Sequence, residues 1–307
     1  MSAAARLGQA AFFPAVMAGA IGAMLVLLHA GLPPTAAFVP PLALAYATVA
    51  LGERRMPFRS EWSRARGDVR VDVAHFLGSG IVGVEAARPL LMAAAVAMAE
   101  PLSAAFHAPL WPRAWPLVAQ LALAVVLGDF FLYWMHRLSH EVEWLWRFHS
   151  IHHSAPRLYF FNAHRFHPID LVLSYASWYV PVVALGAGPE LVVLHTLFTA
   201  VNGIFKHTNF PLRLGWWNHV FSTAETHRWH HSRVLGEANA NYGQNSMIWD
   251  VLFGTWLLPA DRQPPVDVGL ADAQLGAFPR DYAGQLLAPL RWRRMRAVEA
   301  DARSADC

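Results

Sequence analysis

Four long apolar runs dominate the first half of this chain and constrain its fold more than any other feature. They cover residues 11–31, 35–52, 74–98 and 115–135, and each is long enough to cross about 30 Å of hydrocarbon as a helix. The chain as a whole is 55% hydrophobic and 15% charged, which is more apolar than an ordinary soluble domain. We therefore expect an all-α integral membrane protein with about four transmembrane helices.

Two of the apolar segments need a further interpretation. The first run could be a signal peptide, but only Arg6 supplies positive charge before it and no clean cleavage site follows it, so a retained span is favoured. A later apolar stretch, 169–204, is broken by the sequence GAGPE at 186–190. This break predicts a membrane-embedded hairpin that enters and leaves on the same side.

The charges indicate a topology. The loop 53–70 is rich in arginine, and such loops remain on the cytoplasmic side of a membrane. We therefore do not read the arginines as a nucleic-acid footprint, and we expect no nucleic-acid partner. Counting passes from this loop returns the chain to the cytoplasm before residue 136. We expect an N-terminal transmembrane region (1–114), a histidine-rich region (115–258) and a cytosolic C-terminal tail (259–307).

Histidines are concentrated in the second of these regions. Thirteen of the sixteen histidines lie between residues 136 and 231, in the patterns HRLSH (136–140), HSIHH (149–153) and HRWHH (227–231). Imidazoles three or four residues apart share one face of a helix and can converge on one metal ion. The single cysteine, Cys307, excludes a thiolate cluster. These eight histidines predict a site for two adjacent metal ions on the cytoplasmic face of the membrane.

Two classes of function can use such a site. One is a redox enzyme, and the alternative is a non-catalytic metal- or haem-binding protein of the membrane. A single histidine is usually an ordinary hydrogen-bonded group, but burying eight without a metal would leave many polar atoms unsatisfied, at about 1–3 kcal/mol each. A metal carrier would also need a polar path through the spans. These runs contain few polar groups, mainly His75, Glu85, Arg88 and Asp129, which favours the enzyme.

Four stretches carry a resemblance to a known family. They are DFFLYWMHRLSH (129–140), NAHRFHP (162–168), KHTNF (206–210) and NYGQNSMIWDVLFGT (241–255). Together with the order of the histidine motifs, they resemble the fatty acid hydroxylase and sterol desaturase superfamily of membrane-bound di-iron oxygenases. The resemblance covers roughly residues 115–258, so this region would be the catalytic domain.

The resemblance implies a cytosolic helical cap that holds the histidine-rich dimetal site, and it implies a specific chemistry. It implies two non-haem iron ions, O2 as co-substrate, and hydroxylation or desaturation of a C–H bond in a lipid such as a sterol, a fatty acyl chain or an ether lipid. The sequence contains no Gly-rich dinucleotide fingerprint, so an external ferredoxin- or cytochrome-type electron donor is expected, unless a pterin serves. The lipid would come from the bilayer, and the expected location is a bacterial inner membrane with the catalytic face in the cytoplasm.

The resemblance also extends the set of candidate site residues. His207 matches a ligand position of the family, and His167 is the preferred tenth ligand, with His164 as the other candidate and an interface role as the alternative. Asp129 could orient the second ring nitrogen of a ligand or serve helix packing. Glu141 resembles a glutamate of the alkylglycerol monooxygenase branch or is a solvated side chain. The full predicted metal set is His136, His140, His149, His152, His153, His167, His207, His227, His230 and His231.

Overall fold

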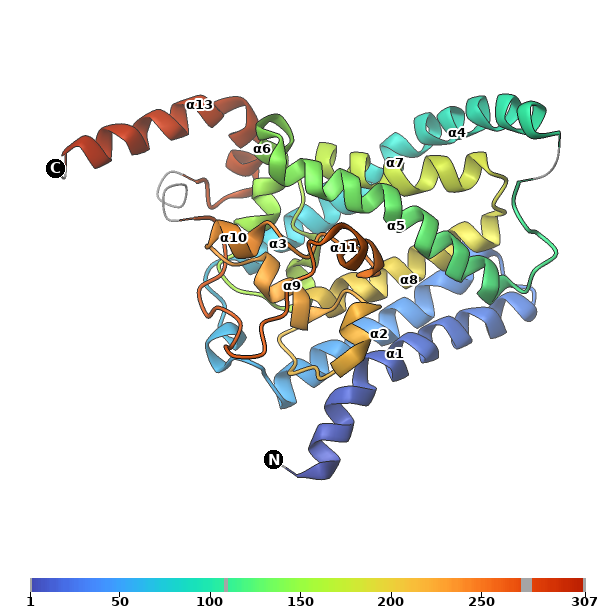
Figure 1. Cartoon of the computed structure of the whole chain (residues 1–307), viewed down its shortest axis with the longest axis horizontal. Helices are drawn as coiled ribbons and strands as arrows, with labels where there is room; N and C mark the ends of the chain where they lie inside the picture. The colour runs from blue at the N-terminus through green and yellow to red at the C-terminus, as the bar shows by residue number, and fades with distance from the viewer. Residues whose placement is uncertain (1, 108–109, 272–277, 306–307) are drawn as a thin grey trace.

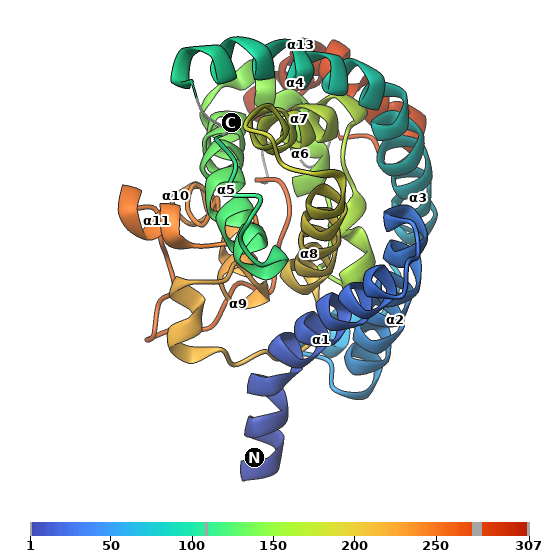
Figure 2. The same cartoon turned by 90° about the vertical axis from the view of Figure 1, so that its right-hand side faces the viewer.

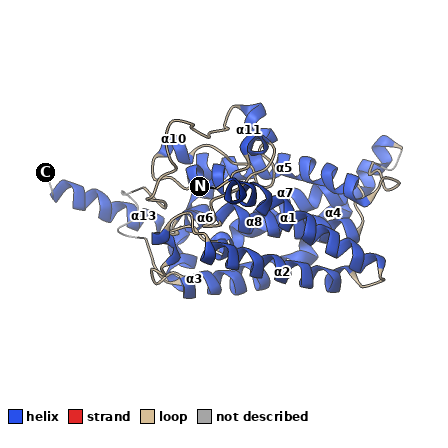
Figure 3. Ribbon diagram, turned by 90° about the horizontal axis from the view of Figure 1, so that it is seen from below, coloured by secondary structure: helices blue, strands red, loops and turns tan. Residues whose placement is uncertain are grey.

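The fold is all-helical. The computed structural model describes residues 2–107, 110–271 and 278–305, and within these ranges it contains helices, loops and two isolated β-bridges but no strand (Figure 3). Four helices are long and apolar enough to cross a membrane, as the sequence predicts: residues Ala5–His29, Pro34–Arg55, Val69–Phe106 and Leu117–Glu141. The all-α membrane class with a histidine-rich cap is thereby confirmed.

The spans run side by side along the long axis of the molecule (Figure 1). They consist of α1 (Ala3–His29), α2 (Pro34–Arg55), a composite of α3 (Val69–Ala74), a π-helix (His75–Gly83) and α4 (Val84–Phe106), and finally α5 (Leu117–Glu141). The third and fourth spans extend beyond the predicted 74–98 and 115–135. Hydropathy detects only the apolar part of a helix, and the polar ends of these two helices continue out of that part.

The predicted hairpin is formed by α7 (Pro168–Ala184) and α8 (Pro189–His207). It packs among the spans, with α7 against α4 and α5 and with α8 against α1, α2 and α5 (Figure 2). Pro168 and Pro189 occupy the first turns of the two helices, where a missing N–H costs nothing. Gly186 has φ of +105° in the turn between them, a conformation that favours glycine.

Short helices form a cap at one end of the spans (Figure 1). They are α6 (Glu143–His153), α9 (Ala224–His230), α10 (Leu235–Ala238), α11 (Ile248–Phe253) and the 3-10 helices Ser60–Ser63, Phe160–His164 and Gly215–His219. The last helix, α13 (Tyr282–Ala305), starts against this cap and projects away from it.

Two apolar cores hold these parts together. The larger one joins α1, α2, α5 and α8 and contains Phe13, Met24 and Phe205. A smaller core joins Ile151 of α6 to Trp292 of α13. Part of the segment 259–307, including the start of α13, is therefore packed onto α6.

Candidate metal centre

Helix ends bring the clustered histidines together. The last two turns of α5 carry His136 and His140, and the C-terminal half of α6 carries the HSIHH motif. His207 is the last residue of α8, and α9 carries the HRWHH motif up to its C-cap. All four helices end at the cap, so motifs far apart in the sequence meet at one level of the molecule.

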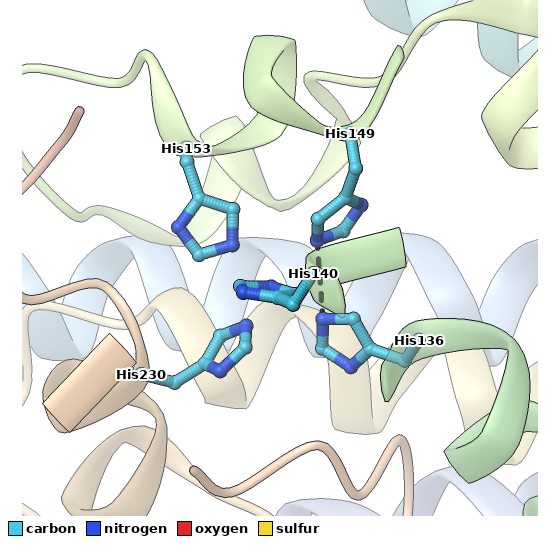
Figure 4. Close-up of side chains that lie close together, drawn as sticks. All are labelled: His136, His140, His149, His153 and His230. Carbon is cyan, nitrogen blue, oxygen red and sulfur yellow. Dashed lines mark hydrogen bonds between the residues drawn. The ribbon is translucent and has the colours of Figure 1, made fainter. Parts of the chain in front are cut away.

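The side chains form two groups. A five-histidine group and a four-histidine group each have one ligand atom per residue, and within a group these atoms lie within 4.8 Å of one another. The members are His136, His140, His149, His153 and His230 in the first group (Figure 4), and His152, His207, His227 and His231 in the second. Nine of the ten predicted metal ligands are thus brought together.

The two groups are direct neighbours. His152 and His153 are consecutive residues that belong to different groups, and the rings of His153 and His231 stack with centroids 4.4 Å apart. A third inter-group contact places the rings of His149 and His152 5.4 Å apart. Two ions held by these groups would therefore lie side by side.

A shared hydrogen-bond pattern fixes the rings of six histidines. In each of them Nδ1 faces an oxygen acceptor, so Nδ1–H donates outward and Nε2 keeps a free lone pair. The pairs are His136 with the Tyr242 carbonyl (2.7 Å), His140 with Asn239 Oδ1 (3.3 Å), His149 with Asp170 Oδ2 (3.0 Å), His152 with the Arg165 carbonyl (3.2 Å), His207 with Asn162 Oδ1 (2.8 Å) and His230 with the Ala240 carbonyl (2.7 Å). Histidines that bind metals are oriented by such outer partners.

The inner nitrogens fit a metal. Nε2 of His136 lies 3.1 Å from Nε2 of His149, and Nε2 of His207 lies 3.2 Å from Nε2 of His152. Nitrogens bound at about 2.1 Å to one ion are separated by roughly 3 Å or slightly more. Buried ring nitrogens without a hydrogen-bond partner include Nε2 of His140, His153 and His230. Each would cost about 1–3 kcal/mol unsatisfied, and coordination to an ion would satisfy them.

Burial favours the neutral form of several of these imidazoles. It lowers the pKa of His152, His153, His227 and His231 well below the usual value, and neighbouring histidines add to the effect. For His230, burial lowers the pKa to about 3. The buried ammonium of Lys206, which donates to Gln244 Oε1 at 2.8 Å, also disfavours protonation of several of these rings. Neutral imidazole is the form that binds metal ions.

His167 lies outside both groups. It is the N-cap of α7, where its Nδ1 accepts from the Ile169 N–H (3.1 Å) and its Nε2 donates to the Leu286 carbonyl (3.3 Å). Both ring nitrogens therefore have protein partners: Nδ1 caps α7, and Nε2 joins α7 to α13. The other candidate, His164, bonds through Nε2 to the Tyr46 hydroxyl. Neither residue is brought to the ligand nitrogens, so the structure assembles nine histidines instead of ten.

The two predicted carboxylates bond to residues outside the two histidine groups. Asp129 accepts hydrogen bonds from the backbone N–H groups of Asn245 (3.0 Å) and Ser246 (2.5 Å) and from the Asn245 side chain. It thus ties the loop after the third histidine motif to α5, as the packing alternative predicts. Glu141 forms an ion pair with Arg137 at 2.7 Å, and its side chain is 45% exposed, so it is a surface residue.

Three side chains that orient ligands were missed in the sequence. They are Asp170, Asn162 and Asn239. Asn162 belongs to the NAHRFHP stretch, and Asp170 lies two residues after it. Polar residues in and next to this motif were therefore candidates for orienting the histidines. Their pairing with His149 and His207 depends on the tertiary fold.

Comparisons with known proteins identify a family and several relatives. A family model described as fatty acid hydroxylase matches residues 121–255. The ornithine lipid hydroxylase OlsE of Rhizobium tropici is 39% identical over 244 residues, which is 79% of this chain and 72% of OlsE. Alkylglycerol monooxygenase of Danio rerio is 30% identical over 191 residues, 62% of this chain and 40% of that protein.

A third relative matches at lower identity. Methylsterol monooxygenase 2-2 of Arabidopsis thaliana is 28% identical over 174 residues, which cover 54% of this chain and 62% of that protein. No solved structure matches the chain. The resemblance predicted from the histidine motifs is confirmed, and the identity to OlsE over most of both chains is decisive: the chain belongs to the fatty acid hydroxylase family.

Proposed function

We propose that this protein is a membrane-bound, O2-dependent di-iron hydroxylase that oxidises a C–H bond of a lipid. The observation that carries the proposal is the pair of neighbouring histidine groups, with nine imidazoles in total. In six of them the outer nitrogen is bonded and the inner nitrogen remains available for a metal. The five-histidine group would hold one ion and the four-histidine group the other.

Iron fits both the imidazole ligands and the oxygenation reactions for which the relatives are named. Imidazole binds iron, zinc and copper, but zinc has no redox chemistry, and the relatives are named as hydroxylases and monooxygenases. When bound, the two irons supply O2 activation and hydrogen abstraction. Overall, one oxygen atom enters the C–H bond, and two electrons and two protons convert the other to water. The names of the relatives favour hydroxylation over desaturation.

The protein supplies position and shielding. Asp170, Asn162 and Asn239 would hold three rings in their ligand orientation, and backbone carbonyls would hold three others. The loop that Asp129 fixes to α5 would close the site next to the third motif. Most of the nine rings are buried, so bulk water would be excluded from the reacting atoms.

The lipid substrate is argued from the spans and the relatives. Four apolar helices adjoin the cap, and the names of relatives refer to an ornithine lipid, alkylglycerol and methylsterol. We propose that the substrate enters from the bilayer. The arginine-rich loop 53–70 favours a cytoplasmic position of the cap, and the membrane would be a bacterial inner membrane. Electrons would come from a separate ferredoxin- or cytochrome-type donor.

Isotope incorporation tests this proposal. The purified chain, reconstituted with a bacterial lipid extract, a ferredoxin and its reductase, is exposed to 18O2, and the lipids are analysed by mass spectrometry. One 18O atom should appear in a lipid, and His153→Ala should abolish it. His29→Ala is the matched control, because His29 is exposed at the far end of α1. Metal-loaded protein that never labels a lipid with any suitable donor would favour the non-catalytic alternative.

A further inference from the structure

A cavity lies in the cap beside the histidine groups. Its volume is about 470 Å³, a size typical of sites for small ligands. Four arginines line it, and they come from four separate parts of the chain: Arg66, Arg165, Arg233 and Arg280. We refer to it below as the arginine cavity.

Basic side chains outnumber acidic ones among the described residues that line the arginine cavity. Among its described lining residues the single carboxylate is Asp68, and the buried Arg157 already binds it at 2.6 Å and 3.3 Å. Asp72 similarly pairs with Arg165 at 2.6 Å. These two carboxylates therefore stand against the guanidinium groups of Arg66, Arg157, Arg165 and Arg280. Arg66 donates to the Pro156 carbonyl at 3.0 Å, which uses only one of its five N–H groups. Guanidinium groups in this arrangement suit phosphate or carboxylate.

The walls of the cavity also suit an amphiphile. Leu270 and Phe278 are buried apolar residues that line it together with the arginines. Arg66 and Asp68 lie directly before Val69, where the third candidate span begins. Arginines next to the cytoplasmic end of a span lie where anionic lipid head groups are found.

The arginine cavity adjoins the metal centre. A neighbouring cavity of about 230 Å³ is lined by His140 and His153 of the five-histidine group, and the two cavities share Arg233 and Leu270 as lining residues. Ser154, which lines the arginine cavity, directly follows His153 in the chain. A molecule with its anionic end in the arginine cavity would therefore lie beside the ligand histidines.

We propose that the arginine cavity binds the phosphate or carboxylate of an anionic lipid head group, and that this lipid is the substrate. The first half of this statement concerns binding alone, whereas the second half rests on the proposed hydroxylase function. The substrate class is thereby narrowed from lipids in general to lipids with an anionic head group.

Binding of a short-chain lipid tests the inference without turnover. Dihexanoyl phosphatidic acid is titrated into the full-length chain in a neutral detergent, with no electron donor present, and followed by calorimetry. Arg66→Gln with Arg280→Gln should weaken binding at least about tenfold, because charged hydrogen bonds are lost. Both arginines are exposed, so the fold should be retained. Binding unchanged in this double variant would overturn the inference.

The matched control removes the same charge elsewhere. Arg64→Gln with Arg70→Gln changes two exposed arginines of the same loop that do not line the cavity, and it should leave the affinity within about twofold. An equal loss in both double variants would mean a non-specific charge effect and would refute the site.

Three competitors distinguish the sources of the anion. Dihexanoylglycerol, which lacks the phosphate, should bind at least about tenfold more weakly than the phosphatidic acid. Inorganic phosphate that displaces the lipid at equal concentration would indicate a site for free anions and would overturn the lipid assignment. A hexaglutamate peptide that displaces the lipid as effectively would instead indicate docking of an acidic protein.

The same samples separate this inference from the proposed function. Iron content should be unchanged in the Arg66→Gln, Arg280→Gln variant, because neither residue belongs to the histidine groups. Specific lipid binding by a chain that never hydroxylates lipids would support the head-group site and refute its role in substrate recognition.

Discussion

Replacement of Asp170 by asparagine should weaken metal binding by the five-histidine group. Asp170 lies in the first turn of α7, and its Oδ2 accepts a hydrogen bond from His149 Nδ1 at 3.0 Å. The two residues are only 2% and 3% exposed, so water cannot replace the carboxylate. Asparagine keeps the shape and can still accept a hydrogen bond, but it removes the negative charge next to Nδ1 of His149.

The expected magnitude follows from the burial of this pair. Loss of an outer partner of a ligand histidine typically lowers metal affinity about 10–100-fold, which corresponds to roughly 1.4–2.7 kcal/mol. The loss of metal affinity in Asp170→Asn should lie near the lower end of this range, because a hydrogen-bond acceptor remains. Asp170→Ala should lie near the upper end, because it leaves the Nδ1–H of His149 buried without an acceptor.

Chelator competition under anaerobic conditions measures these affinities for Fe2+. Asn239→Ala is the graded comparison, because its contact with His140 Nδ1 is longer, 3.3 Å, and Asn239 is exposed. Its effect should be smaller than that of Asp170→Asn, since water can replace the amide. Wild-type affinity in Asp170→Ala, or an equal loss in Asn239→Ala, would refute the reasoning.

Three further predictions concern residues around the site. His167→Ala should retain the full metal content, because its ring nitrogens already bond to the Ile169 N–H and the Leu286 carbonyl; metal analysis showing a lost ion would contradict this. Glu141→Gln should change stability by no more than about 0.5 kcal/mol in thermal unfolding, because an exposed ion pair with Arg137 contributes little; a loss of several kcal/mol would show a buried role. The metal-free chain should lose stability as the pH falls below about 6.5. Burial lowers the pKa of the cap histidines, so the unfolded chain takes up protons that the folded chain does not. Each such histidine lowers the free energy of unfolding by roughly 1.4 kcal/mol per pH unit, and a melting temperature that stays constant from pH 7.5 to 5.5 would refute this.

The spans could be predicted well because hydropathy depends only on composition along the chain. The π-helix His75–Gly83 could not, because its conformation depends on neighbours distant in sequence. Gly78 lies against α13 so closely that a Cβ would be 2.2 Å from the hydroxyl oxygen of Tyr282. Gly83 similarly lies against Pro168 at the start of α7. A close approach of this kind is set by the tertiary structure and leaves no periodic signal.

The histidines of the two groups could be predicted from the sequence because the imidazole side chain itself is the group that binds a metal. Their outer partners could not, because three of the six are backbone carbonyls, which every residue possesses. The position of His167 outside both groups could not be predicted for a related reason. A histidine before a proline at the start of a helix can be an N-cap as well as a ligand, and only the position of α7 relative to the other motifs decides between the two roles.

The iron content of the purified chain tests the central claim most directly. The chain is purified anaerobically after expression with added iron, and iron and zinc per polypeptide are determined by mass spectrometry on a sample that hydroxylates lipid. Two neighbouring histidine groups predict two iron atoms per chain. An active sample that contains one iron atom per chain, or none, would contradict the account.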